Sequence, residues 1–280
     1  MIRIPFTKMT GAGNDFVVID NRKNVIHGDI EAFTLRVCDR RFGVGADGLL
    51  LLQPSKQADF QMRYLNADGS TGSMCGNGGR CIARFAHQLG IVTGEMQFEA
   101  AGHIYKAKLL NETVRLHMKD PTEIQPLTLS VEGEQWQGYW VDTGAPHVVV
   151  FTDEMGTPIQ ELDLGHWGPK LRRHERFAPA GTNVDFVQTL SNNSLRMRTF
   201  ERGVEAETLA CGTGAVAAAL VSAAFKALVS PVVVTAQSGR RLVINFRGSQ
   251  RKYSDVTLEG DAQTTFTGEL NIDDETSRVE

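Results

Sequence analysis

Two cysteines of this 280-residue chain occupy matching places in two similar segments. Cys75 lies in SMCGNGGRCIARFA and Cys211, 136 positions later, lies in ETLACGTGAVAAAL; each precedes a glycine-rich turn and an apolar run. At the start of a helix, unpaired N–H groups and the helix dipole stabilise a thiolate, and they can lower a cysteine pKa from about 8.5 to roughly 3.5–7.5. The spacing therefore predicts two activated thiols.

The same turns could bind the carboxylate of a substrate. Glycines leave the backbone N–H groups open to close approach, so each turn could hold both a base and an anion. If two such halves face one cleft about a pseudo-two-fold axis, one thiolate removes a proton from one face of a carbon while the other thiol delivers a proton to the opposite face. With each sulfur about 3 to 3.5 Å from that carbon, the sulfurs would lie roughly 6 to 7 Å apart. This layout predicts inversion of a stereocentre, with the two roles exchanged in the reverse reaction.

A proton next to a carboxylate is weakly acidic, so the helix starts must also supply electrostatic stabilisation. Positioned acid–base catalysis contributes about 10²- to 10⁴-fold, and a single preorganised donor is worth roughly 3 to 4 kcal/mol. The sequence contains no clear pocket for pyridoxal phosphate, and two thiols with two glycine-rich turns make an imine cofactor unnecessary. We expect no cofactor and no metal.

The elements that position the thiols are also repeated. TGAGNDFVVID at Thr10 resembles TGAPHVVVF at Thr143, GADGLLLL resembles GTNVDFVQ, and MRYLN resembles MRTFE, with offsets of 133 to 136 residues. A repeat of this length is the size of a domain, far longer than a solenoid unit. We expect domains over residues 1–122 and 129–263, joined by the proline-containing segment PTEIQPLTLSVEGEQW. The tail strand within 264–280 could return to pair with the first domain.

Each half combines short strands with one or two helices. Runs rich in Val, Ile, Phe and Thr predict the strands FVVID, LLLLQ, DFQMRYL, TVRLHMKD, VVVF, VDFVQTL, PVVVTAQ and RLVINFR. Ile82, Phe85, Ala86 and Leu89 have helical spacing, with Gly90 as the C′ residue. Residues 215–225 are apolar on every side, as expected of a helix enclosed by a curled sheet. The predicted fold class is α+β, with two similar domains, each a mixed or antiparallel sheet around a central helix.

Composition excludes several classes of function. The net charge is −4 with mixed signs along the chain, which does not suit a nucleic-acid partner. The apolar run at 215–225 is too short to cross a membrane, and the N-terminus does not resemble a signal peptide, so we expect a cytoplasmic protein. Four cysteines without paired CxxC spacing fit neither a disulfide scaffold nor a zinc site. We interpret Cys38 and Cys81 as core residues.

The stretch GVGADG matches a dinucleotide fingerprint in composition only. That motif requires a strand before the glycines and a helix after them. Here a helix-like segment, EAFTLRVCDRR, comes first and the apolar LLLL strand follows. We therefore expect no nucleotide site at these glycines.

Taken together, the motifs resemble those of the diaminopimelate epimerase family. They are KMTGAGNDFVVID, RRFGVGADGLLLL, NADGSTGSMCGNGGRC, TGAPH, GTNVDF and ERGVEAETLACGTG, and they span nearly the whole chain in order. The resemblance implies a cofactor-independent enzyme of lysine and peptidoglycan precursor synthesis that interconverts LL- and meso-2,6-diaminopimelate. It also implies a small-molecule diamino-dicarboxylate as substrate and a homodimer.

The resemblance assigns roles by position. Cys75 and Cys211 would be the acid/base pair, and His147 and Glu201 would tune the pKa of the thiols. Glu201 and Arg202 would pair with the distal ammonium and carboxylate of the substrate. The remaining substrate contacts would come from the side chains of Asn14, Asn66 and Asn183 and from the backbone of Gly76, Asn77, Gly212 and Thr213.

Three positions depart from the family pattern. Ala145 stands where many members have asparagine, Gly48 stands where some have glutamine, and ERGVEAET is one residue longer than expected, so its loop must bulge ahead of Cys211. These changes bear on contacts at the distal end of the substrate.

Other interpretations of the same residues remain open. A two-cysteine racemase acting on proline or hydroxyproline would need no distal recognition, and a redox protein would instead join Cys75 and Cys211 in a switchable disulfide. His147 could be a core histidine, Asn66 could build a turn together with Asp68, and Glu201 with Arg202 could be an exposed pair.

Overall fold

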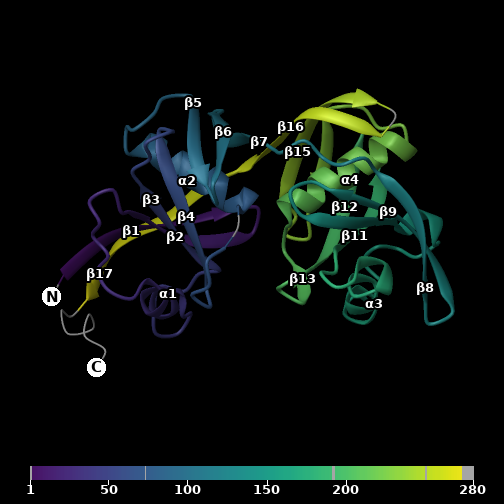
Figure 1. The fold of residues 1–280 in the computed structure, drawn as a ribbon, viewed down its shortest axis with the longest axis horizontal. Coiled ribbons are helices and arrows are strands. Elements are labelled where there is room, and N and C mark those ends of the chain that lie inside the picture. The colour runs from purple at the N-terminus through teal and green to yellow at the C-terminus, as the bar shows by residue number, and fades with distance from the viewer. Residues whose placement is uncertain (1, 73, 191–192, 250, 273–280) are drawn as a thin grey trace. The chain divides into compact units, whose positions relative to one another are not determined.

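The computed structural model describes residues 2–72, 74–190, 193–249 and 251–272. The chain forms two compact units (Figure 1). The first comprises the residues up to Leu116 together with those from Gly260 onward, and the second comprises His117–Glu259. Residues 273–280 of the expected tail lie outside the described residues.

The first unit is built on a mixed sheet. Its strands lie in the order β17, β1, β2, β3, β4, β5, β6 and β7. The pairs β2–β3 and β4–β5 are parallel and the others are antiparallel. The tail strand β17 therefore lies beside β1. The bounds are β1 Ile2–Gly11, β2 Asn14–Asp20, β3 Gly48–Gln53, β4 Phe60–Asn66, β5 Glu95–Ala100, β6 His103–Leu109, β7 Thr113–His117 and β17 Gln263–Ile272.

The second unit repeats this topology. The order is β8, β9, β10, β11, β12, β14, β15 and β16, and the parallel pairs β10–β11 and β12–β14 occupy the same places in it. The short strand β13 adds a hairpin to β12. The bounds are β8 Gln125–Val131, β9 Glu134–Asp142, β10 Pro146–Phe151, β11 Asn183–Leu190, β12 Ser194–Glu201, β13 Ala206–Thr208, β14 Val232–Thr235, β15 Arg241–Ser249 and β16 Lys252–Asp261.

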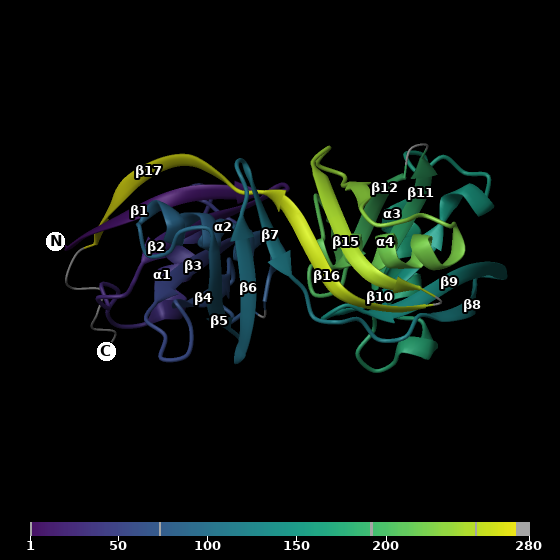
Figure 2. The same ribbon diagram turned by 90° about the horizontal axis from the view of Figure 1, so that it is seen from above.

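Each unit has a central helix that packs on its own strands (Figures 1 and 2). Helix α2, Gly76–Gln88, contacts β1, β2, β3, β4 and β6, and helix α4, Gly212–Phe225, contacts β9, β10, β11, β12, β14 and β15. Gly90 follows α2 with φ +70° and donates to His87 O, while Ile91 donates to Ala86 O. These two bonds form the Schellman end expected of a C′ glycine. The α+β class and the pair of similar units are thus confirmed.

Two further helices precede β3 and β11. Helix α1, Ile30–Cys38, is the expected helix-like segment, and it lies before the glycines that lead to β3. This order confirms that GVGADG lacks the strand–turn–helix context of a dinucleotide site. Helix α3, Leu164–Arg172, was not predicted, because it contains Pro169 and two glycines. Short 3₁₀ turns occupy Thr152–Glu154 and Glu175–Phe177.

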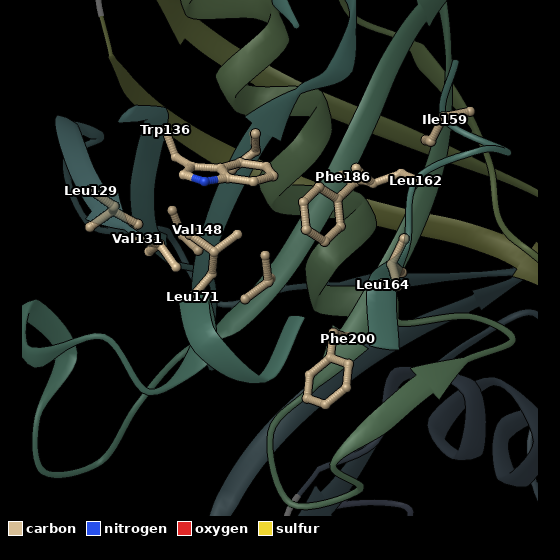
Figure 3. Packing of buried hydrophobic residues seen from close by; sticks show 12 residues of the cluster. Leu129, Val131, Trp136, Val148, Ile159, Leu162, Leu164, Leu171, Phe186 and Phe200 are labelled. Atoms are coloured by element: carbon tan, nitrogen blue, oxygen red, sulfur yellow. The ribbon is translucent and has the colours of Figure 1, made fainter. Parts of the chain in front are cut away.

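Helix α3 packs on the hydrophobic core of the second unit, to which its residues Leu164 and Leu171 belong (Figure 3). Trp136 on β9 and Phe186 on β11 are in edge contact, with ring centroids 6.1 Å apart. A Cβ atom at Gly168 would lie 2.4 Å from the ring of Phe200 on β12, so glycine is required where α3 crosses that strand. Within the described residues, none of the helices has both the length and the apolar character needed to span a membrane.

Candidate functional site

Cys75 is the N-cap residue of α2. Its backbone is extended, with φ −106° and ψ 120°, and its Sγ accepts a hydrogen bond from Gly78 N–H at 3.5 Å. Gly79 N–H donates to Cys75 O at 2.7 Å. The N–H groups of Gly76 and Asn77 precede this bond, so the helix itself does not pair them. The half-buried thiol and two backbone donors thus share one helix start, as the sequence predicts.

A chain of amides supports the first turn of α2. Asn77 Nδ2 donates to Asn14 Oδ1 at 2.5 Å, and Asn14 Nδ2 donates to Asp47 Oδ2 at 3.0 Å. Asp47 also pairs with Arg40, which binds Asp15 at 2.8 Å. Burial raises the pKa of Asp15, but hydrogen bonds from Arg40 and Lys8 outweigh it and lower that pKa to about 2.

Arg80 is a fully buried cation one turn along α2. Its guanidinium donates to Asn77 Oδ1 at 2.8 Å, to Gly76 O at 3.3 Å and to Asp261 O at 3.1 Å. Burial lowers the pKa of Arg80 because the charged form loses its hydration. The motif NADGSTGSMCGNGGRC contains this arginine, but sequence reasoning gave it no role.

Asn66 lies at the end of β4. Its Nδ2 donates to Ser70 Oγ at 3.0 Å, and Asp68 accepts from both Ser70 N–H and Ser70 Oγ. Asp68 therefore builds the expected turn. Ala67 N–H donates to Asp47 O at 3.1 Å. This turn therefore lies at the same end of the central strands as Asn14, which begins β2.

Cys211 is the N-cap residue of α4, again with extended backbone, φ −120° and ψ 116°. Its Sγ lies 3.5 Å from Thr213 Oγ1, and Ala215 N–H donates to Cys211 O at 3.0 Å. Thr143 Oγ1 donates to Thr213 O and ties the turn to the TGAPH segment. Burial first, then the carboxylates of Glu201 and Asp185, raise the pKa of Cys211 well above its usual value. This direction is opposite to the lowered pKa predicted from the helix start, because burial outweighs the hydrogen bonds from Thr213 and Gly214.

His147 connects this turn to a buried carboxylate. Its Nε2 lies 2.9 Å from Thr213 Oγ1, and its Nδ1 lies 2.7 Å from Asp185 Oδ2. Both His147 and Asp185 are fully buried, and Thr199 Oγ1 donates to Asp185 Oδ1 at 2.7 Å. Sequence reasoning missed Asp185 and Thr199. The available signal was a carboxylate inside the apolar run VDFV of this strand, because a charged group in a core needs a partner.

Asn183 and Glu201 lie beside His147 on neighbouring strands. Asn183 pairs in register with His147, donates to Pro146 O at 2.9 Å and accepts from Arg202 N–H at 2.8 Å. Glu201 ends β12 and is half-buried, and burial raises the pKa of its carboxyl group. The second unit thus brings together His147, Asn183, Glu201, Arg202, Cys211, Gly212 and Thr213.

The extra residue in ERGVEAET is taken up by a hairpin turn between β12 and β13. Glu201 pairs with Ala206, Glu205 N–H donates to Glu201 O, and Gly203 has φ +93°. Glu205 forms ion pairs with Arg172, the last residue of α3, and with the C-cap residue Arg173, both at 2.6 Å. The turn is therefore anchored to α3.

The other two positions that depart from the family pattern are Gly48 and Ala145. A Cβ atom at Gly48 would lie 2.5 Å from the ring of Tyr64 and 2.6 Å from Leu65 O, so this chain has no space for a longer side chain there. Ala145 contributes its carbonyl, which accepts a hydrogen bond from Thr143 N–H.

All four cysteines carry free thiols. Cys38 and Cys81 are buried, and burial raises the pKa of each to about 12. Thiols of this kind are poor nucleophiles near neutral pH, as expected of core residues. Among the described residues, no cluster of three or more His, Cys, Asp or Glu side chains is arranged to hold a metal ion.

The family model and the curated relatives that this chain matches carry the same family name. The family model described as "Diaminopimelate epimerase" matches residues 6–124 and 139–264. A protein of that name from Chlorobaculum tepidum is 43% identical over 94% of this chain and 100% of its own length. Another from Aquifex aeolicus is 40% identical over 95% of this chain and 97% of its own length.

Solved structures share the fold at low sequence identity. A PhzF-family phenazine biosynthesis protein from Bacillus anthracis has a TM-score of 0.72 and 15% identity, covering 97% of this chain and 100% of the other. A probable proline racemase from Agrobacterium radiobacter has a TM-score of 0.71 and 16% identity, covering 96% and 93%. At this identity the similarity extends to the fold alone.

Proposed function

This chain belongs to the diaminopimelate epimerase family, and on that premise we propose that it interconverts LL- and meso-2,6-diaminopimelate by proton transfer at the α-carbon. Cys75 and Cys211 are the two bases of the proposal. One thiolate takes the α-proton, the other thiol gives a proton to the opposite face, and the roles exchange in the reverse direction. The reaction requires both thiols to reach the same α-carbon in the working enzyme.

The observation that carries this proposal is the repetition of one arrangement. Both cysteines are N-cap residues with extended backbone, and each helix lies between matching strands of two units with the same topology. The first turn of each helix offers backbone N–H groups to an anion. Such donors stabilise the charge that develops on the substrate carboxylate when the α-proton leaves.

Recognition of the distal end of the substrate is assigned to Glu201 and Arg202. Glu201 offers a carboxylate to the distal ammonium, and Arg202 offers a guanidinium to the distal carboxylate. The bond from Arg202 N–H to Asn183 Oδ1 supports this assignment, because it fixes the backbone of Arg202 next to His147 and Asn183. A proline racemase would have no use for such a pair.

The test follows hydrogen at the α-carbon. LL-2,6-diaminopimelate is incubated with the enzyme in deuterated water, and the products are separated and analysed by mass spectrometry and NMR. We expect meso-diaminopimelate with one deuterium, at the inverted carbon. Cys75→Ser and Cys211→Ser should each abolish inversion, while Cys38→Ala, which alters a buried core thiol, should retain it.

Other outcomes separate the alternatives. Inversion that persists in both serine variants would overturn the two-base assignment. Turnover of proline but not of diaminopimelate would favour the racemase, and a redox response without turnover would favour a thiol switch. The homodimer implied by the family is tested separately by sedimentation equilibrium of the purified chain.

A further inference from the structure

We propose that Asp185 is a positioning residue, which holds His147 as the proton acceptor for Cys211 through the hydroxyl of Thr213. The contacts form a continuous path from the buried Asp185 Oδ2 to His147, from His147 to Oγ1 of the half-buried Thr213, and from Thr213 Oγ1 to Cys211 Sγ. The role of this path in turnover rests on the proposed function. Its effect on the thiol does not, and this allows the two to be tested apart.

Asp185 is held on both sides. Its Oδ1 accepts from Thr199 Oγ1 at 2.7 Å, and its Oδ2 lies 2.7 Å from His147 Nδ1. The first turn of α4 presses against it, because a Cβ atom at Gly214 would lie 2.5 Å from Asp185 Oδ1. The carboxylate therefore has one orientation, and it directs the imidazole toward the start of α4.

The carboxylate fixes the proton on Nδ1. Nδ1–H donates to Asp185 Oδ2, and this leaves Nε2 of the neutral ring as an acceptor. Thr213 O–H then donates to Nε2, and the thiol of Cys211 donates to Thr213 Oγ1. Asn183 Nδ2 lies 3.4 Å from the same Nε2, which also suits an acceptor at that atom.

Proton transfer along this path balances without any other reactant. The S–H bond of Cys211 breaks as its proton bonds to Thr213 Oγ1, and the hydroxyl proton of Thr213 moves to His147 Nε2. The thiol becomes a thiolate, the neutral imidazole becomes an imidazolium, and threonine is regenerated. Nδ1–H remains on Asp185 throughout, so the path works in both directions.

The charged groups around Cys211 distinguish two models of how Asp185 acts. The carboxylates of Asp185 on β11 and Glu201 on β12 both act on the Cys211 thiol through their negative charge, and His147 on β10 is the group among them that can accept its proton. A carboxylate acting only through its charge disfavours the thiolate. A carboxylate acting through His147 favours the thiolate, because it stabilises the imidazolium that takes the proton. Neutralising Asp185 should therefore shift the titration in opposite directions under the two models.

The first experiment needs no substrate. In the full chain carrying Cys75→Ser, the ¹³Cβ resonance of Cys211 is titrated by NMR with and without Asp185→Asn. The path predicts that the midpoint of thiolate formation rises by roughly 1 to 3 pH units in the variant. A midpoint that falls or stays the same would overturn the proposal, and circular dichroism confirms that the variant is folded.

The second experiment removes the hydroxyl instead of the carboxylate. Thr213→Val should lower kcat for diaminopimelate about 100-fold or more with little change in KM, and Thr213→Ser, which keeps the hydroxyl, should recover most of this loss. Ser222→Ala is the matched control, because it removes a buried hydroxyl of α4 that has no hydrogen-bond partner. Equal kcat in the valine and serine variants would contradict the path. An inactive wild-type chain would instead reject the proposed function, and the NMR titration would still test the path.

Discussion

Asn77 donates a hydrogen bond from Nδ2 to Oδ1 of Asn14 at 2.5 Å, at the start of the central helix of the first unit. In the second unit, Thr213 and His147 occupy the matching positions, with Oγ1 and Nε2 2.9 Å apart. One contact joins two amides, which do not titrate, whereas the other joins a hydroxyl to an imidazole. The two helix starts thus share their geometry and differ in their capacity to accept a proton.

Replacing Asn14 by aspartate should make the amide chain sensitive to pH. The new carboxylate would lie about 3 Å from Asp47, where Asn14 Nδ2 now donates at 3.0 Å, and two carboxylates at that distance cannot both ionise easily. We expect Asn14→Asp to lower the free energy of unfolding by about 1 to 3 kcal/mol at pH 7, and to recover part of this loss as the pH falls toward 5. Asn111→Asp, at an exposed amide, serves as the control in urea denaturation. An equal loss at pH 5 and pH 7 would show that charge repulsion is not the cause.

The third residues of the two central helices give a matched pair of glycine substitutions. At Gly214 the added Cβ would meet Asp185 Oδ1 at 2.5 Å, and Asp185 cannot move without losing Thr199 or His147. At Gly78 the nearest atom is the flexible end of Leu50, at 3.2 Å.

We expect Gly214→Ala to destabilise the chain by about 1 to 3 kcal/mol through overpacking. Gly78→Ala should be close to neutral, or stabilising by up to about 1 kcal/mol, because alanine favours helices. Thermal and urea unfolding of the two variants provide the comparison. Equal effects would mean that the position of Asp185 does not depend on the absence of a side chain at residue 214.

The glycine-rich turns made the helix starts predictable. A cysteine followed by small residues and an apolar run signals an N-cap and a buried helix, and the repeat at 133 to 136 residues located the second copy. α4 was easy to place, because its residues are apolar on all sides. Helix α3 could not be predicted in this way, because Pro169 and Gly168 are unfavourable in a helix interior. The structure explains the glycine, since the ring of Phe200 leaves no space for a side chain at residue 168.

The chemistry around the thiols was harder to predict than their position. Family resemblance pointed to His147, but nothing in the local spacing connects it to Asp185, 38 residues away on the parallel strand β11. The same holds for Thr199, which reaches Asp185 across the antiparallel pair β11–β12. Register between strands fixes these contacts, and register follows from the packed sheet rather than from any one segment.

The buried thiols should make the protein less stable at alkaline pH. Burial raises the pKa of the core thiols Cys38 and Cys81 to about 12. Above about pH 8.5 the thiols of the unfolded chain lose protons that the folded chain retains, so the free energy of unfolding falls by up to about 1.4 kcal/mol per pH unit for each thiol.

Cys38→Ala tests this dependence. The variant should unfold more easily at pH 7, because a buried side chain is truncated. Its free energy of unfolding should nevertheless decline less steeply than that of the wild type between pH 8.5 and 10. Urea titrations at closely spaced pH values measure both slopes. Parallel slopes would show that the thiol of Cys38 does not hold its proton as burial requires.

The anchored turn between β12 and β13 should affect binding more than chemistry. Glu205 joins this turn to Arg172 and Arg173, and Arg202, the proposed contact for the distal carboxylate, lies within it. Glu205→Gln weakens the ion pairs, so we expect KM for diaminopimelate to rise several-fold with kcat nearly unchanged. Since Glu205 is exposed, stability should change by less than about 1 kcal/mol. Glu154→Gln, which weakens the ion pair with Lys226 in the same unit, is the control and should leave KM unaltered. A fall in kcat with unchanged KM would indicate that the turn supports the reacting groups, because loss of an interaction made only in the transition state lowers kcat.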